Sequence, residues 1–165
     1  MPHECPVEAR SLENLRCAER FVVWALREWR LRWSDGEARP GTLRCGFHHA
    51  NCGDGLTPFC DFMEALVAGT RRPLDVRCMN CPYISPDEDR VLDAAAAAQR
   101  DRDEITCALL MDALPRAAAR IAVGPLAAFA HKMAEAGLVL PRGPALAGDR
   151  ISICRSTNPG IALMQ

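Results

Sequence analysis

Apolar residues recur at steps of three and four along the chain, a spacing typical of helices that face a core. In the first segment, Ser11 to Trp33, the stripe consists of Leu15, Ala18, Val22, Leu26, Trp29 and Trp33. Ser11 is a favourable residue to cap the start of this helix, and the arginines near its end suit the helix dipole. A second stripe of Cys17, Phe21 and Trp24 makes the helix apolar on more than one side. We therefore expect this helix to be central, or to be covered by a partner.

The strongest local signal for a helix start is a capping box formed by Ser85 and Glu88, with Pro86 at the first helical position. The helical pattern that follows continues to Leu114. We expect an interruption in its charged stretch, 100–104.

Three shorter patterns complete the helical prediction. One covers 57–68, and another covers 117–123. The last begins at Gly124-Pro125 and ends at Gly137, and Leu138 is placed for the hydrophobic contact of a Schellman cap.

Together these patterns predict an all-α fold, a small bundle of four to six helices with an irregular Cys/His-rich, metal-binding insertion at 39–82. We assign 1–141 to a single helical domain that includes the insertion, and 142–165 to an extended C-terminal tail. The sequence has neither the strand–helix alternation of a parallel sheet nor a repeat of solenoid length.

Composition and charge reduce the number of functions that the protein could have. The chain has 165 residues, enough to bury a core without disulfides. With 20 basic and 21 acidic residues its net charge is −1, so no overall field attracts nucleic acid or an anionic membrane. No apolar run reaches the length of a bilayer span, and the first residues do not resemble a signal peptide. We expect a cytoplasmic protein that binds another protein, with nucleic acid as a less favoured partner and no membrane.

The nine cysteines are the most informative part of the composition. Five of them lie in the insertion with two histidines, in the order Cys45-x2-His48-His49-x2-Cys52, then Cys60, then Cys78-x2-Cys81. Ligands separated by two residues can converge on one ion, and two such pairs complete a tetrahedral site, for which zinc is the best match. The predicted zinc ligands are Cys45, His48, Cys78 and Cys81, with Cys52 as the main substitute for His48, and His49 or Cys60 as further substitutes.

Two other uses of the same cysteines stay open. An iron–sulfur cluster is one, although the spacing matches neither common ferredoxin pattern; its ligands would be Cys52, Cys60, Cys78 and Cys81. The other is a redox dithiol of Cys78 and Cys81, because a helix start soon after such a pair favours the thiolate.

The insertion has few large apolar side chains for its length, so a metal would help to order it. Ordering the backbone costs about 1 kcal/mol per residue. Zinc binding in small peptides contributes about 10 kcal/mol, which is enough to offset part of this cost. We therefore expect a strong chelator to loosen the insertion before it affects the helices.

No motif of a known catalytic site is present in the sequence, so we lean against an enzyme. Candidate partner-binding residues are Trp24, which lies off the main stripe, and Arg71 and Arg72, because tryptophan and arginine dominate interface hot spots. We predict a zinc-binding, non-catalytic regulatory or assembly factor that acts through protein–protein contacts. The alternatives are an iron–sulfur or dithiol redox protein and a zinc-knuckle nucleic-acid-binding regulator.

Overall fold

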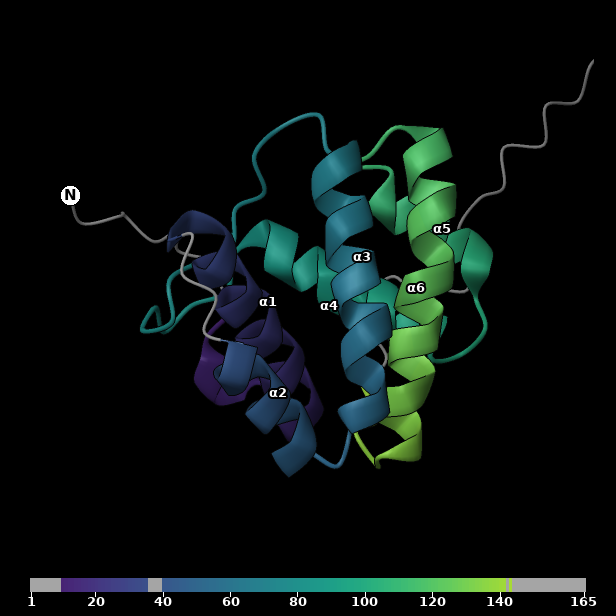
Figure 1. Cartoon of the computed structure of the whole chain (residues 1–165). Helices are drawn as coiled ribbons and strands as arrows, with labels where there is room; N and C mark the ends of the chain where they lie inside the picture. Colours follow the sequence, from purple (N-terminus) through teal and green to yellow (C-terminus); the bar gives the residue numbers. More distant parts are fainter. Residues whose placement is uncertain (1–9, 36–39, 142, 144–165) are drawn as a thin grey trace, which may run out of the picture.

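The all-α prediction of four to six helices is confirmed. The computed structural model describes residues 10–35, 40–141 and 143, which form six α-helices, two 3-10 helices and no strand (Figure 1). An isolated antiparallel bridge joins Ser11 to Tyr83. The elements are η1 (Leu12–Asn14), α1 (Cys17–Asp35), α2 (Pro40–His49), η2 (Gly53–Gly55), α3 (Leu56–Gly69), α4 (Pro86–Ala98), α5 (Asp103–Leu110) and α6 (Arg116–Glu135). None of the described helices is both long enough and apolar enough to cross a membrane.

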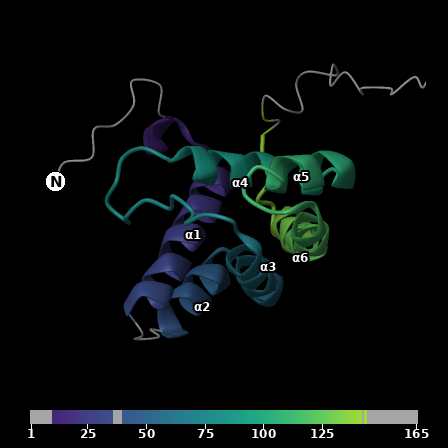
Figure 2. The ribbon, with the colours of Figure 1, turned by 90° about the horizontal axis from the view of Figure 1, so that it is seen from above.

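The helices α3 and α6 run side by side and form the largest helix–helix contact of the described chain (Figure 1). Helices α4 and α5 pack against each other and lie along one edge of the molecule in the view from above (Figure 2). Helix α1 contacts both α2 and α4. The segment between α3 and α4 passes beside α1, and this arrangement creates the site described below (Figure 2).

Three phenylalanine rings form the centre of the core. Phe47 of α2, Phe59 of α3 and Phe129 of α6 are each no more than 1% exposed. Their ring centroids lie 5.5 Å (Phe47–Phe59), 5.1 Å (Phe59–Phe129) and 6.0 Å (Phe47–Phe129) apart. Such pairs each add about 0.5–1.5 kcal/mol beyond the burial of their area. The three rings therefore hold α2 against the α3–α6 pair.

The prediction of an irregular insertion with a single helix is wrong for residues 40–49, which form α2. Leu43 and Phe47 lie four residues apart on one side of α2, and both are buried. The pattern is hard to see in the sequence because two apolar residues do not define a period and because α2 contains Gly41 and Gly46, poor helix formers. Packing against the core therefore stabilises a helix that local propensity disfavours.

The insertion contributes more to the core than its few large apolar side chains led us to expect. Several of the largest fully buried side chains belong to it: Leu43, Phe47, Phe59, Phe62 and Met63. Burial of a side chain of this size contributes about 1.5–3 kcal/mol. The apolar side chains of α2 and α3 therefore offset part of the entropy cost of ordering the insertion, which is the contribution that was expected from a metal.

Residues 116–135 form one helix, and the prediction of two helices that meet at Gly124-Pro125 is wrong. Pro125 lacks the N–H that would bond to the carbonyl of Ile121, but Ile121 is 69% exposed, so water can reach this end of the turn. Buried Ala122 and Leu126 on either side of this point face the same core. Packing on one continuous face keeps α6 together.

Local hydrogen bonds determine where the first helix begins and where the last helix ends. The hydroxyl of Ser11 caps η1 rather than α1, by accepting from the N–H of Glu13 at 3.3 Å. Helix α1 begins at Cys17, where the carboxylate of Glu19 accepts from the N–H of Arg16 at 2.8 Å. The end of α6 confirms the Schellman prediction: Gly137 has φ 81°, and Leu138 donates to the carbonyl of Met133 at 2.8 Å.

The interruption predicted at 100–104 is confirmed as the connection between α4 and α5, where Asp101 has φ 55°. The side chain of Gln99, at the end of α4, ties this connection to the end of the described chain. It donates to the carbonyls of Ala130 and Leu138 and accepts from the N–H of Leu140, at 2.9–3.1 Å. The remainder of the predicted tail, 142–165, lies outside the described residues apart from Gly143.

Candidate functional site

A buried ion pair between Arg27 of α1 and Glu88 of α4 is the anchor of the candidate site. Their side chains are 2% and 0% exposed. Arg27 donates from Nε and Nη2 to the two carboxylate oxygens of Glu88, at 2.8 and 3.1 Å. Charges removed from water are tolerated only when they are paired and hydrogen-bonded, and both conditions are met here.

The same ion pair holds the loop that precedes α4. Arg27 donates from Nη1 to the carbonyl of Cys81 and from Nη2 to that of Tyr83, both at 2.8 Å. Glu88 accepts from the N–H groups of Ser85 and Arg77, at 2.8 and 3.1 Å, and the hydroxyl of Ser85 accepts from the N–H of Glu88, which completes the predicted capping box. The loop 76–84 is therefore fixed against α1 (Figure 2).

This loop, η1 and α1 enclose a mostly apolar groove of about 270 Å³. Its apolar walls are Leu12, Val23, Trp24 and Met79, and its polar lining is Glu13, Arg20 and Arg27. Pockets for drug-sized ligands span about 300–1,000 Å³. The volume of the groove lies just below this range. We call it the Trp24 groove.

Helix α2 determines the position of the Trp24 ring. The indole lies so close to Gly46 that a Cβ at this residue would overlap it. The ring also stacks on Phe21, with a centroid distance of 5.9 Å and an interplanar angle of 29°. Trp24 is therefore half-buried between α1 and α2, and it lines the groove that was named after it.

Arg20 places a positive charge at the rim of the Trp24 groove. Its guanidinium donates to the main-chain oxygens of Leu15 and Glu13, at 3.0 and 2.9 Å. Within the described ranges, Arg20 forms no ion pair with a carboxylate. The charge of Arg27, in contrast, is neutralised by Glu88. Arg20 is thus the lining cation whose charge is available to a ligand.

Cys78 and Cys81 lie at the two ends of a tight turn whose central residues are Met79 and Asn80. The N–H of Cys81 donates to the carbonyl of Cys78 at 3.1 Å. Cys78 is exposed and Cys81 is half-buried. The residue between them that lines the Trp24 groove is Met79.

The other predicted zinc ligands lie on different elements. Cys45, His48 and His49 are on exposed positions of α2, Cys52 is buried before η2, and Cys60 is half-buried on α3. Among the residues that the structure describes, no three or more His, Cys, Asp or Glu side chains lie close enough together to hold a metal ion. Zinc, the iron–sulfur alternative and these ligand sets therefore stay predictions.

Two of the predicted ligands do meet, at a polar pocket of about 280 Å³ that His48 and Cys52 line together with Asp54, Lys132 and Glu135. Burial is the main cause that raises the pKa of the Cys52 thiol. Lys132 donates to Glu135 at 2.7 Å. A thiol that is held protonated is a poor metal ligand and a poor nucleophile.

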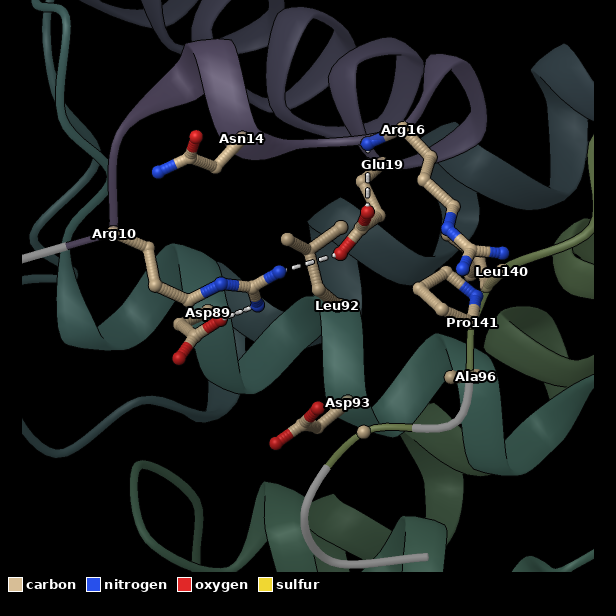
Figure 3. A pocket seen from close by; sticks show the side chains of 11 residues that line it. Arg10, Asn14, Arg16, Glu19, Asp89, Leu92, Asp93, Ala96, Leu140 and Pro141 are labelled. Carbon is tan, nitrogen blue, oxygen red and sulfur yellow. Dashed lines mark hydrogen bonds and ion pairs between the residues drawn. The ribbon is translucent and has the colours of Figure 1, made fainter. Parts of the chain in front are cut away.

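A third pocket, of about 350 Å³, lies between the start of α1, the middle of α4 and the end of the described chain (Figure 3). Arg10 forms ion pairs with both Glu19 and Asp89 across it, and the distance to Glu19 is 2.7 Å. Asp93 lines the same pocket, and burial, reinforced by the charge of Asp89, raises the pKa of its carboxyl. Most charges of this pocket therefore satisfy one another.

The two arginines predicted to bind a partner differ in their surroundings. Arg72 donates from Nη1 and Nη2 to the two carboxylate oxygens of Asp87, both at 2.6 Å, and so helps to hold the connection to α4. Arg71 is exposed, and its main-chain N–H donates to the carbonyl of Ala113 at 3.2 Å. A role for either residue in partner binding stays a prediction.

The central pair of this site was not predicted from the sequence. Glu88 was identified as a capping residue, and Arg27 as one of several cations at a helix end. The available signal is that Arg27 follows buried Val23 by four residues, which places a charge on an apolar side of α1.

Comparison of the chain with protein-family models, with curated proteins and with solved structures finds no match in any of the three.

Proposed function

We propose that this protein is a non-catalytic protein–protein interaction factor that binds a partner segment in the Trp24 groove. The observation that carries the proposal is an apolar groove whose two walls, α1 and the loop 76–84, are joined by the buried arginine Arg27, which bonds to two carbonyls of the loop. A preformed groove lowers the ordering cost of binding. Tryptophan and arginine at such a position are the residue types that dominate binding energy at interfaces.

The lining of the groove specifies the chemistry of the partner. Four apolar side chains accept a bulky apolar side chain of a short segment. Arg20, whose charge is not neutralised by an ion pair in the described chain, favours a carboxylate next to that anchor. Glu13 lies on the same rim and disfavours a carboxylate on its own side. The proposed occupant is therefore an apolar anchor flanked by an acidic residue on the side of Arg20.

Selection from a random peptide display library against the folded, reduced protein tests this proposal. We expect the enriched peptides to share a bulky apolar residue next to Asp or Glu. In titrations of a labelled selected peptide, Trp24→Ala and Arg20→Glu should each weaken binding by at least about tenfold, as hot-spot residues do. Glu13→Lys should strengthen it, because it removes the opposing charge.

Ile121→Ala is the matched control, since Ile121 is a large apolar side chain on α6 that is 69% exposed. It should bind the peptide as the wild-type protein does. Arg20→Glu changes a surface residue and keeps the test valid if Trp24→Ala fails to fold. Enriched peptides that bind Arg20→Glu as tightly as the wild type, or a selection that yields no shared motif, would overturn the proposal.

A further inference from the structure

The turn from Cys78 to Cys81 meets the requirement that a disulfide places on the distance between two Cα atoms. The residues at the two ends of a β-turn have Cα atoms less than about 7 Å apart. Disulfides join Cα atoms that are about 4.4–6.8 Å apart. The N–H of Cys81 bonds to the carbonyl of Cys78, so the hydrogen bond of the turn already holds the two residues close together.

Both sides of this turn are fixed to the rest of the protein. After the turn, the main-chain carbonyl of Cys81 accepts from Arg27 at 2.8 Å, and the carbonyl of Pro82 accepts from the N–H of Leu12 at 2.8 Å. Before the turn, the N–H of Arg77 donates to the side chain of Glu88, and the side chain of Arg30 donates to the carbonyl of Val76. These contacts hold the two cysteines at the ends of the turn whether or not they are bonded to each other.

We infer that Cys78 and Cys81 form a redox-active dithiol that is oxidised by a low-molecular-weight disulfide such as glutathione disulfide. This inference does not depend on the Trp24 groove binding a partner. The exposed thiolate of Cys78 attacks one sulfur of the oxidant, which forms a mixed disulfide and releases one thiolate. Half-buried Cys81 then attacks the sulfur of Cys78 and releases the second. Two protein thiols and one disulfide thus give one protein disulfide and two small thiols.

The other exposed cysteines of the described chain have no second cysteine placed in such a turn. Cys17 and Cys45 are exposed, but no second cysteine lies within four residues of either in the sequence, and Cys52 is buried. We expect an oxidant to leave Cys17 and Cys45 at the stage of a mixed disulfide. The difference between a closed disulfide and a retained adduct therefore distinguishes the pair from a reactive single thiol.

The test is incubation of the reduced, full-length protein in buffers of stepped glutathione to glutathione disulfide ratio, followed by alkylation and mass spectrometry of peptides. We expect the Cys78–Cys81 peptide to lose two hydrogen atoms with no retained glutathione. Cys81→Ser should trap glutathione on Cys78, and Cys45→Ser, the control, should leave the closed disulfide unchanged.

Phenylarsine oxide, which bridges two neighbouring thiols, gives a second measurement that needs no oxidation. The wild-type protein should bind the arsenical at this turn, and Cys78→Ser should lose that binding while it remains folded by circular dichroism. The inference is overturned if oxidised Cys78 and Cys81 are joined to other cysteines, if they keep glutathione as separate adducts, or if they stay reduced at ratios that modify Cys45.

Discussion

Arg27 and Glu88 are 61 residues apart in the chain, yet two hydrogen bonds join them at a place where neither side chain is more than 2% exposed. Two further N–H groups of the guanidinium donate to the carbonyls of Cys81 and Tyr83. One arginine of α1 thus fixes the conformation of a loop that is distant in the sequence.

Arg27→Met is expected to destabilise the protein by about 3–5 kcal/mol, because it leaves the carboxylate of Glu88 buried without a countercharge. Urea unfolding followed by circular dichroism measures the effect. Arg27→Met combined with Glu88→Met should recover part of the loss, since no unpaired charge remains. A single variant that unfolds at the wild-type urea concentration would show that the pair contributes nothing to stability.

Gly46→Ala is expected to destabilise the protein by about 1–3 kcal/mol, the usual cost of overpacking. The added Cβ overlaps the indole of Trp24, so that α2 or the ring must move. The same movement changes one wall of the Trp24 groove. Tryptophan fluorescence should therefore change together with the free energy of unfolding.

Gly41→Ala is the matched control in the same helix. A Cβ at Gly41 meets nothing within 4 Å, so this substitution should stabilise α2 by up to about 1 kcal/mol through helix propensity. If both alanine variants were stabilised equally, the close contact between Trp24 and α2 would be refuted.

Asp93 and Asp87 are expected to affect stability in opposite directions as the pH changes. Burial and the charge of Asp89 raise the pKa of Asp93 above 3.8. A carboxyl with a raised pKa binds its proton more tightly when folded, so stability falls as the pH rises from 3.8 through the raised pKa. Asp93→Asn should therefore increase the free energy of unfolding at pH 7, and the gain should vanish below pH 3.8.

For Asp87, burial alone would raise the pKa of the carboxyl, but hydrogen bonds from Arg72 and from the N–H of Asp75 outweigh it, and the pKa lies below 3.8. Its contribution is present above pH 3.8 and is lost as the pH falls through the lowered pKa. Asp87→Asn should therefore lower the free energy of unfolding at pH 7. Urea titrations of both variants at a series of pH values check this, and changes of the same sign at pH 7 would contradict it.

Elemental analysis of the protein, purified under reducing and anaerobic conditions, tests the zinc prediction. One equivalent of zinc that is lost on Cys78→Ser would confirm it. For the effect of a chelator, the core packing predicts the opposite of what the sequence suggested, because buried Leu43, Phe47 and Phe59 order α2 and α3. Hydrogen exchange should show these helices equally protected with and without a strong chelator, and loss of their protection would mean that a metal orders them.

Elements with strong local determinants were predictable from the sequence. The capping box of Ser85 and Glu88 and the Schellman cap at Gly137 need only neighbouring residues, and both are present in the structure. Helix α2 and the continuity of α6 through Pro125 depend on burial against other helices. Helix propensity disfavours both features, because glycine and proline are poor helix formers. The tertiary packing that overcomes this preference leaves no pattern among neighbouring residues.

The candidate site could be predicted only in part, for the same reason. Trp24 was identifiable as an apolar residue off the main stripe of α1. The opposite wall, Met79, and the anchor Glu88 come from a segment far along the chain. The hydrophobic pattern of α1 and that of the segment with Met79 and Glu88 do not indicate that the two lie side by side. The groove between them is therefore seen only in the folded structure.

The order of synthesis gives the Arg27–Glu88 pair a further consequence. Helix α1 leaves the ribosome before the loop and α4 exist, and on the nascent chain the guanidinium of Arg27 has only water to bind. Since Glu88 follows it by 61 residues, α1 cannot bury this charge until α4 has begun to emerge. A chain that terminates before Glu88 therefore lacks the partner of Arg27 and leaves the apolar side of α1 that faces α4 exposed.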